Sequence, residues 1–306
     1  MTERKAGAAG RAYDLVAIDV DGTLLDSRNR LADDTLAAIR AVRARGIGVT
    51  VVSGRGLLQL GQWLERLELE LPYIGSGGAF IADPLSGQVI EHSPLDRGVL
   101  ATIVGLARAG QVGIFFEEPD RFVGEACPEI IRSIHTIAGA EVFVTPDILR
   151  DTTIAPTKMF MTGDHARLVP IEAEIRRLQL PVNQSFAAPI YLEVTRQGVN
   201  KGTALARLAS HLGLPLERIA VIGDGGNDVS MFRRAGLAIA MGNAEPEVKA
   251  AADVVAPTND DGGVAWALRE LILKDVRRGP SPAKLGASSP PRASSAAALP
   301  HREGGA

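Results

Sequence analysis

Short apolar runs alternate with amphipathic stretches along the first part of the chain. The apolar run Leu15-Val16-Ala17-Ile18 predicts a strand buried on both faces over 13–19, and two further apolar segments predict strands at 47–52 and 71–74. Apolar residues at helical spacing predict helices from about 33 to 46 and from 57 to 67. Asp33 and Asp34 are placed to cap the first helix. Strand, helix, strand, helix, strand is the order of a parallel, doubly wound α/β sheet.

The pattern changes between residues 83 and 188, where strand-like pieces alternate with longer helices. The predicted strands are 113–117, 141–145 and 158–162, and the predicted helices are 95–108 and 166–178. This texture is typical of an inserted α+β domain. Linkers are expected near Ala82-Asp83-Pro84 and Ala187-Ala188-Pro189.

The alternation of apolar strands and amphipathic helices resumes after residue 189. Helices are expected at about 201–212 and 245–251, and strands at 218–223, 237–240 and 253–255, with residues 263–272 closing the sheet. The sequence thus predicts a Rossmann-like core of residues 12–82 and 189–276, with residues 83–188 as an inserted cap domain. Residues 1–11 are small and polar, and 277–306 are rich in Pro, Ala and Ser, so both ends are expected to be disordered.

Two aspartates, Asp19 and Asp21, directly follow the first predicted strand in Asp19-Val20-Asp21-Gly22-Thr23. Side chains alternate along extended backbone, so both carboxylates are expected on one side of the chain. Like charges this close repel unless a cation lies between them or one is protonated, and either arrangement serves catalysis. Asp-Gly is also common turn chemistry, so these five residues alone leave an acidic turn equally open.

A second acidic pair, Asp224 and Asp228, lies at another predicted strand end in Gly223-Asp224-Gly225-Gly226-Asn227-Asp228. The carboxyl ends of parallel strands share one sheet edge, where ligands bind in open α/β sheets. Several carboxylates at one edge suit Mg²⁺, which takes hard oxygen ligands and phosphate oxygens. Taken alone, this segment is equally a glycine-rich turn.

Three further residues at the same predicted edge can hold a phosphate group. Ser53 supplies a hydroxyl, Gly54 a backbone N–H, and Lys201, at a helix start in Gly198-Val199-Asn200-Lys201-Gly202, a positive charge. Each is ordinary by itself. Together they are the donors that a phosphate dianion needs, because phosphoryl transfer is catalysed mainly by positioning and charge neutralisation.

The order of these motifs resembles the haloacid dehalogenase superfamily, and within it the Cof-type (subfamily IIB) sugar phosphatases, which carry a large cap between the second and third motifs. The resemblance covers residues 13–272. Its markers are Asp19 to Leu24, Val52 to Arg55, Gly198 to Gly202 and Gly223 to Met231.

The resemblance implies a catalytic role for each acidic residue. Asp19 would attack phosphorus and form an aspartyl-phosphate, and Asp21 would act as general acid and then as general base. Mg²⁺ would be held by the Asp19 carboxylate, the Asp21 main-chain carbonyl and Asp224, with Asp228 supporting the site from outside the ligand shell.

The resemblance also implies a substrate-binding set. Ser53, Gly54 and Lys201 would bind the phosphoryl oxygens, and Asn227 would lie near the substrate or the metal. Asn243 matches a further family position, although an amide that stabilises its loop is an equally open interpretation.

One segment departs from the family pattern, which commonly has Asn-Gly where this chain reads Ser76-Gly77-Gly78. The absence of Asn at Gly77 puts a substrate contact in doubt and leaves the core chemistry unchanged. In the predicted cap, Arg121, Lys158, Glu117 and Glu118 are candidates to meet a substrate's polar groups. Solvated surface charge is the more common state of such residues and is the favoured interpretation.

Composition narrows the remaining possibilities. The chain has 306 residues and a net charge of −3; the segment after residue 276 carries +4, which leaves −7 on residues 1–276 and argues against a nucleic-acid partner. A single cysteine, Cys127, fits a reducing compartment, and no apolar run is long enough to cross a bilayer. A cytoplasmic monomer or homodimer is expected. Five histidines lack metal-ligand spacing: His92, His135, His165, His211 and His301.

The sequence therefore predicts a Mg²⁺-dependent phosphatase of small phosphorylated metabolites, with sugar phosphates first among them. A phosphomutase, which returns the phosphate to its substrate, is an open alternative, and so is a phosphate-ligand sensor without turnover. A kinase is disfavoured because the chain contains no Gly-x-x-x-x-Gly-Lys-Ser/Thr loop.

Overall fold

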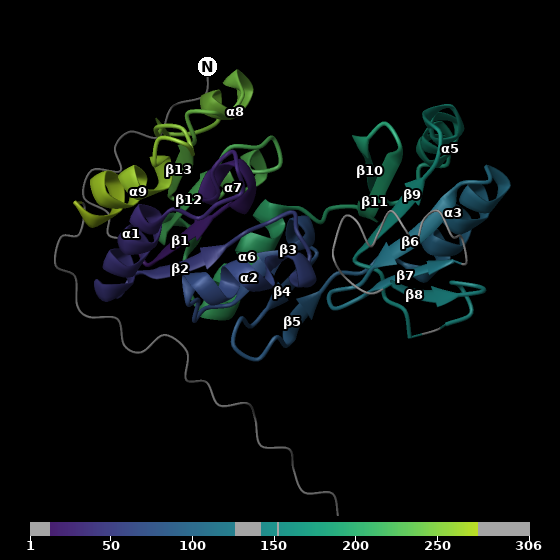
Figure 1. Cartoon of the computed structure of the whole chain (residues 1–306), viewed down its shortest axis with the longest axis horizontal. Helices are drawn as coiled ribbons and strands as arrows, with labels where there is room; N and C mark the ends of the chain where they lie inside the picture. The colour runs from purple at the N-terminus through teal and green to yellow at the C-terminus, as the bar shows by residue number, and fades with distance from the viewer. Residues whose placement is uncertain (1–12, 126–141, 152, 275–306) are drawn as a thin grey trace, which may run out of the picture.

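The computed structural model describes residues 13–125, 142–151 and 153–274 (Figure 1). The expectations for residues 1–11 and 277–306, and those for Cys127, His135 and His301, fall outside this part of the chain. Within it, strands form one five-stranded, one six-stranded and one three-stranded sheet. None of the described helices is long and apolar enough to span a membrane.

The central sheet has five parallel strands in the order β14-β13-β12-β1-β2. Its strands are β1 (Leu15–Ile18), β2 (Gly48–Val51), β12 (Ile219–Gly223), β13 (Leu237–Ala240) and β14 (Val254–Val255). All four residues of β1, the strand between β12 and β2, are buried. Parallel strands joined by crossover helices confirm the predicted doubly wound α/β fold.

Helices cover both faces of the central sheet (Figure 1). They are α1 (Asp33–Ala44), α2 (Leu57–Leu67), α6 (Lys201–Leu212), α7 (Val229–Phe232), α8 (Pro246–Ala250) and α9 (Gly263–Ala267), the last continuing as a wider helical turn over Leu268–Leu273. Val16 and Ile18 of β1 share an apolar core with α1, α2 and α9. Leu15 and Ala17 pack with α6, α7 and α8. Because strand side chains alternate, one strand anchors both helical layers.

The prediction that Asp33 or Asp34 caps α1 is wrong. The N-cap is Ala32, and both aspartates lie inside the first turn without a capping hydrogen bond. The Asp34 carboxylate instead pairs with Arg269. Nη1 of Arg269 donates to Oδ2 at 2.8 Å, and Nη2 donates to Oδ1 at 2.6 Å. The two negative charges still lie at the helix N-terminus, where the helix dipole favours them.

The third predicted strand forms, but it does not join the central ladder. β3 (Tyr73–Gly75) pairs antiparallel with β4 (Phe80–Ala82), which pairs with β5 (Val89–His92). A parallel bridge between Val52 and Ile74 links β3 to the end of β2. The chain reverses through Ser76-Gly77-Gly78, whose φ angles are +45°, +67° and +107°. This left-handed backbone favours glycine and folds β4 back onto β3.

The six-stranded sheet has the order β10-β11-β9-β6-β7-β8. Its strands are β6 (Gly113–Glu117), β7 (Phe122–Glu125), β8 (Val142–Thr145), β9 (Lys158–Thr162), β10 (Val182–Ala188) and β11 (Tyr191–Arg196). Only β7 and β8 pair in parallel. α3 (Arg97–Ala109) and α5 (His165–Arg177) pack on it through a separate apolar cluster. This mixed sheet confirms the predicted α+β cap, and β6 and β9 coincide with the predicted strands.

The two predicted linkers lie inside hairpins, so their placement was wrong. Residues 82–84 lead from β4 into the turn before β5, while residues 187 and 188 end β10 and Pro189 begins the turn to β11. Pro, Asp and Ala at these positions are compatible with a tight turn as well as with a linker, and the sequence pattern does not separate the two. The chain passes between the sheets at 93–96 and 197–200.

Candidate active site

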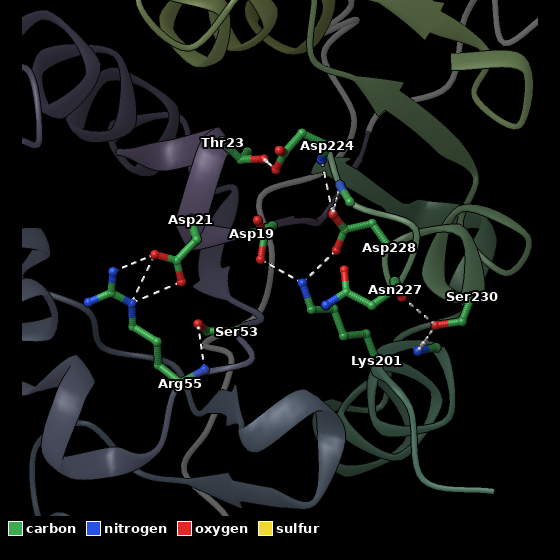
Figure 2. Close-up of polar contacts among 12 residues, drawn as sticks. Asp19, Asp21, Thr23, Ser53, Arg55, Lys201, Asp224, Asn227, Asp228 and Ser230 are labelled. Atoms are coloured by element: carbon green, nitrogen blue, oxygen red, sulfur yellow. Dashed lines mark hydrogen bonds and ion pairs between the residues drawn. The ribbon is translucent and has the colours of Figure 1, made fainter. Parts of the chain in front are cut away.

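The carboxyl ends of three neighbouring parallel strands bring predicted site residues to one edge of the central sheet (Figure 2). Asp19 follows β1, Ser53 lies just beyond β2, and Asp224 follows β12. The Asp19 N–H donates to the Ile222 carbonyl at 2.9 Å, which carries the pairing of β1 and β12 up to this edge. Lys201 enters from the start of α6.

Lys201 lies buried between two carboxylates. Its Nζ is 2.6 Å from Asp19 Oδ1 and 2.6 Å from Asp228 Oδ1. The exposed fractions of Lys201, Asp19 and Asp228 are 2%, 4% and 0%. Charge-assisted hydrogen bonds shielded from water are strong because the surroundings screen them poorly. Lys201 is therefore not a solvated surface lysine.

Several contacts fix the start of α6. The N-cap Asn200 accepts the Thr203 N–H at 2.9 Å, and Thr203 Oγ1 accepts the Asn200 N–H at 3.1 Å. Gly202 packs against α7 so closely that a Cβ would stand 2.0 Å from the Ser230 carbonyl oxygen. Its N–H donates to Ser230 Oγ at 2.9 Å. Lys201 is therefore delivered from a rigid position.

The acidic groups at this edge outnumber the basic ones. Burial raises the pKa of the Asp19 carboxyl to about 8, against the opposing effect of Lys201 and with the support of Asp228 and Asp224. Burial also raises the pKa of Asp224, and a hydrogen bond from Thr23 offsets part of this. Burial disfavours charge on Lys201, but the nearby Asp19 and Asp228 outweigh it, so its pKa is raised. Three carboxyl groups thus lie at an edge with one buried ammonium, and a divalent cation would compensate the charge of the ionised carboxylates.

Two side chains orient the Asp224 carboxylate. Thr23 Oγ1 donates to Asp224 Oδ1 at 2.7 Å. Asn243 Nδ2 donates to the Gly22 carbonyl at 2.8 Å and lies 3.4 Å from Asp224 Oδ2. Asn243 thus stabilises its loop and touches the acidic site, so the two interpretations of this residue are compatible.

Asp19, Asp224 and Asp228 form a cluster that can hold a metal ion, because one carboxylate oxygen from each lies within 4.8 Å of the others. Both oxygens of Asp228 already have partners: Oδ1 accepts from Lys201, and Oδ2 accepts the N–H groups of Asp224 and Gly225 at 2.9 and 2.8 Å. Hard carboxylate oxygens suit Mg²⁺. The contacts of Asp228 fit support of the site better than direct ligation.

The candidate phosphate-binding residues differ in exposure. Ser53 is fully buried, and its Oγ accepts the Arg55 N–H at 3.1 Å. Gly54 is exposed, with open space where a Cβ would stand. Asn227 is exposed. This edge of the sheet therefore combines exposed residues, Gly54 and Asn227, with the buried Ser53 and Lys201.

Asp21 does not share the surroundings of Asp19. Its side chain is 48% exposed and points toward Arg55, whose Nε lies 3.0 and 2.9 Å from Asp21 Oδ1 and Oδ2 (Figure 2). The backbone leaves extended geometry after Asp21, since Gly22 has φ of +76°. The expected pair of side-by-side carboxylates is thus separated, with Asp19 facing Lys201 and Asp21 facing Arg55.

The prediction that Glu117 and Glu118 are solvated is wrong. They are 3% and 6% exposed, at the end of β6 in the cap sheet. Ser76 Oγ donates to Glu117 Oε1, and a Cβ at Gly56 would stand 2.8 Å from the same atom. Burial raises the pKa of Glu117, and Glu118 forms an ion pair with Arg121. The cap sheet therefore contacts the core through Glu117.

The Ser76-Gly77-Gly78 turn also supports the end of β2. The Gly77 N–H donates to the Ser53 carbonyl at 2.8 Å, and the Ser76 N–H donates to the Arg55 carbonyl at 2.8 Å. Backbone N–H groups of this turn make both hydrogen bonds, so they do not depend on the side chain at residue 77. They tie the candidate phosphate-binding segment to β3. Cap contact and phosphate-binding segment thus meet at one turn.

Other sequence candidates lie away from the acidic cluster. Lys158 Nζ is 3.4 Å from Glu193 Oε2 and 5.2 Å from the centre of the Phe160 ring. His92 and His165 contact Thr157 Oγ1 and the Pro189 carbonyl. The metal cluster found among the described residues contains no histidine.

Three residues with no role assigned from sequence take part in these contacts: Thr23 orients Asp224, Arg55 binds Asp21, and Ser230 anchors Gly202. Each lies inside or beside a motif, so closeness to a motif was the available signal. Their partners come from other segments, and a linear sequence gives no direct view of them.

Comparisons with known proteins agree with this geometry. Residues 16–268 match the family model of the haloacid dehalogenase-like hydrolases. The HMP-PP phosphatase of Enterobacter sp. (strain 638) is 32% identical over 236 residues, which cover 76% of this chain and 86% of that protein. A haloacid dehalogenase-like hydrolase from Bacteroides thetaiotaomicron has a similar solved structure, with 30% identity, a TM-score of 0.76, and coverage of 85% of this chain and 99% of that one.

The chain belongs to the haloacid dehalogenase-like hydrolases. Its fold also matches a solved subclass IIB sugar phosphatase, with a TM-score of 0.69, 24% identity, and coverage of 86% of this chain and 100% of that one. The chain is a phosphatase, as the motif order predicted.

Gly22→Ala is expected to lower phosphatase kcat about 100-fold, the scale of loss when a catalytic group moves by about 1 Å. A Cβ at Gly22 would stand 2.3 Å from Asp224 Oδ2, so the new methyl must displace that carboxylate. Steady-state kinetics with an aryl phosphate provides the measurement. Gly87→Ala is the matched control, since Gly87 has a similar φ of +70° with open space around it. Equal activity of the two variants would contradict the assigned importance of Asp224.

Proposed function

We propose that this chain is a Mg²⁺-dependent phosphatase of small phosphorylated metabolites, sugar phosphates first among them, that acts through an aspartyl-phosphate at Asp19. The observation that carries the proposal is the buried Asp19–Lys201–Asp228 arrangement beside Asp224 at the sheet edge. A buried nucleophile with an adjacent cation and spare acidic ligands is what in-line phosphoryl transfer requires.

The proposed reaction has two displacements. An Asp19 oxygen forms a bond to phosphorus while the bond from phosphorus to the leaving oxygen breaks, and Asp21 gives its proton to that oxygen. Asp21 then takes a proton from a water molecule whose oxygen attacks phosphorus, which releases inorganic phosphate and restores Asp19. Ser53, Gly54 and Lys201 would hold the phosphoryl oxygens in both steps.

The donor set of this edge fits Mg²⁺. The Asp19 carboxylate, the Asp21 main-chain carbonyl and Asp224 would hold the ion, with Asp228 and Asn227 beside it. When bound, the ion would neutralise charge on the transferring phosphoryl group. Its binding must displace the proton that burial favours on Asp19.

Mg²⁺ affinity is expected to rise with pH. The folded pKa of Asp19 is about 8, above its ordinary value of 3.8, so the metal-free protein holds a proton there between these values. The Kd of Mg²⁺ should therefore fall by up to about tenfold per pH unit between about pH 6 and about pH 8, and then level off. Isothermal titration calorimetry in buffers of different ionisation enthalpy should show release of close to one proton.

Chelation provides the companion measurement. EDTA should remove nearly all phosphatase activity, and added Mg²⁺ should restore it. A Kd that is constant over the pH range, together with activity that survives EDTA, would count against the metal assignment.

The cap is proposed to choose the substrate by closing over the sheet edge and excluding water. We propose that the inserted domain runs from about residue 94 to about residue 197, since β5 pairs with β4 in the three-stranded sheet while β11 pairs with β9 and β10 in the six-stranded sheet. The single cysteine favours a cytoplasmic enzyme, and the acidic body disfavours a nucleic-acid partner.

A panel of phosphorylated metabolites tests the function as a whole. Net release of inorganic phosphate from sugar phosphates, dependent on Mg²⁺, is the expected result. Isomerised substrate without phosphate release would identify a phosphomutase instead. Tight phosphate binding without turnover of any panel member would identify a sensor.

A further inference from the structure

The Asp21 carboxylate is held by a single guanidinium. Arg55 Nε donates to Asp21 Oδ1 at 3.0 Å and to Oδ2 at 2.9 Å, and Arg55 Nη2 also donates to Oδ1. Among the described side chains, no other forms a hydrogen bond with this carboxylate. Because Asp21 is 48% exposed, packing alone leaves its side chain free to turn, and the contact with Arg55 selects one orientation.

The backbone of Arg55 is fixed on both sides. Its N–H donates to Ser53 Oγ at 3.1 Å, and its carbonyl accepts the Ser76 N–H at 2.8 Å. The next residue, Gly56, lies against the Glu117 carboxylate of the cap. The guanidinium is therefore presented from a rigid segment that joins the candidate phosphate site to the cap contact.

We infer that Arg55 is a positioning residue for Asp21, orienting its carboxyl group for proton transfer to the leaving oxygen. The inference rests on the proposed function, because it takes Asp21 as the general acid and base. Arg55 suits this task because its planar fork binds a carboxylate in one geometry, which a lysine ammonium cannot do. It need not touch the substrate to act.

A positioning role predicts a dependence on the leaving group. An alkyl phosphate releases a basic alkoxide oxygen and needs proton donation, whereas p-nitrophenyl phosphate releases a stable phenolate and needs little. Arg55→Met should therefore lower kcat for glycerol phosphate about 10- to 100-fold, and for p-nitrophenyl phosphate by less than about threefold, with KM nearly unchanged. Arg55→Lys should recover only part of the loss.

The controls separate failure of this inference from failure of the proposed function. Arg269→Met removes another two-pronged Arg–Asp pair, with Asp34, far along the chain from the motifs and should leave both activities unchanged. In an Asp21→Asn background, Arg55→Met should have no further effect, since residues that act as a unit are not additive. Circular dichroism and thermal melting should show that every variant is folded.

Three outcomes decide the matter. A selective loss of kcat for the alkyl phosphate supports the inference. An equal loss for both substrates, or a rise in KM alone, would overturn it and would make Arg55 a structural or substrate-binding residue, while leaving the phosphatase mechanism intact. Activity that is insensitive to Asp21→Asn with both substrates would overturn the general acid itself.

Discussion

Asp19→Asn is expected to lower phosphatase activity by about four orders of magnitude or more, the scale seen when a covalent nucleophile is removed. Asn has nearly the same shape as Asp and keeps an oxygen near Lys201 Nζ, so the fold should persist. An amide oxygen is a poor nucleophile toward phosphorus, and the first displacement should stop. The measurement is phosphate release in Mg²⁺, combined with acid quenching of labelled substrate, which should trap a phosphoenzyme in the wild type only.

Asp19→Asn is expected to keep or raise the stability of the metal-free protein at high pH, although it removes activity. The folded pKa of Asp19 is raised to about 8 from 3.8, so its contribution to stability is full below about pH 4 and is lost as the pH rises through about 8. Without Mg²⁺ at about pH 9, Asp19→Asn should therefore melt at or above the wild-type temperature. An inactive variant that also unfolds would leave the role of Asp19 open to a structural explanation, whereas full activity would exclude the covalent mechanism.

Lys201→Met is expected to abolish activity and to destabilise the metal-free protein by about 3–5 kcal/mol, the usual cost of removing one partner from a buried ion pair. The ammonium lies 2.6 Å from both Asp19 and Asp228, and all three side chains are almost fully buried. Removing it leaves the buried Asp19 and Asp228 side chains without the cation that both contact. Urea denaturation followed by circular dichroism, in EDTA at about pH 8, gives the free energy of unfolding.

Two further variants make this result specific to the buried cluster. Lys274→Met removes an exposed lysine that pairs with Glu270, and its effect on stability should be small. Adding Asp228→Asn to Lys201→Met removes one unpaired charge and should recover part of the lost stability without restoring activity. If Lys201→Met and Lys274→Met were equally stable, the buried cluster would not carry the energy assigned to it.

Strands with a strong pattern could be predicted from the sequence. β6, β9 and β13 have the predicted limits, and α2 runs from Leu57 to Leu67 as expected. The edge of the central sheet was also predictable, because parallel strands deliver their carboxyl ends to one place. Asp19, Ser53, Lys201 and Asp224 meet there, although their catalytic roles stay predictions.

What the sequence could not give depends on contacts between distant segments. Glu117 was interpreted as a solvated charge because glutamate usually is one, whereas in the structure Ser76 and Gly56 of the core lie against its buried carboxylate. The alternation of side chains predicted Asp21 beside Asp19. The left-handed turn at Gly22 and the hydrogen bonds from Arg55 to Asp21 separate the two carboxyl groups. The predicted linkers failed because tight turns and linkers use the same residue types.

The position of β1 has a consequence for how the chain is made. β1 lies between β2 and β12, and residues 15–18 pair with residues 219–222, more than 200 positions later. During synthesis, β1 and β2 therefore leave the ribosome long before β12. The edge of β1 that pairs with β12 stays open until the whole cap has been synthesised. Long-range pairing of this kind is slow, and open strand edges aggregate. The cap sheet is continuous in sequence and can fold first, so the interval before β12 emerges is when the nascent chain depends most on chaperones.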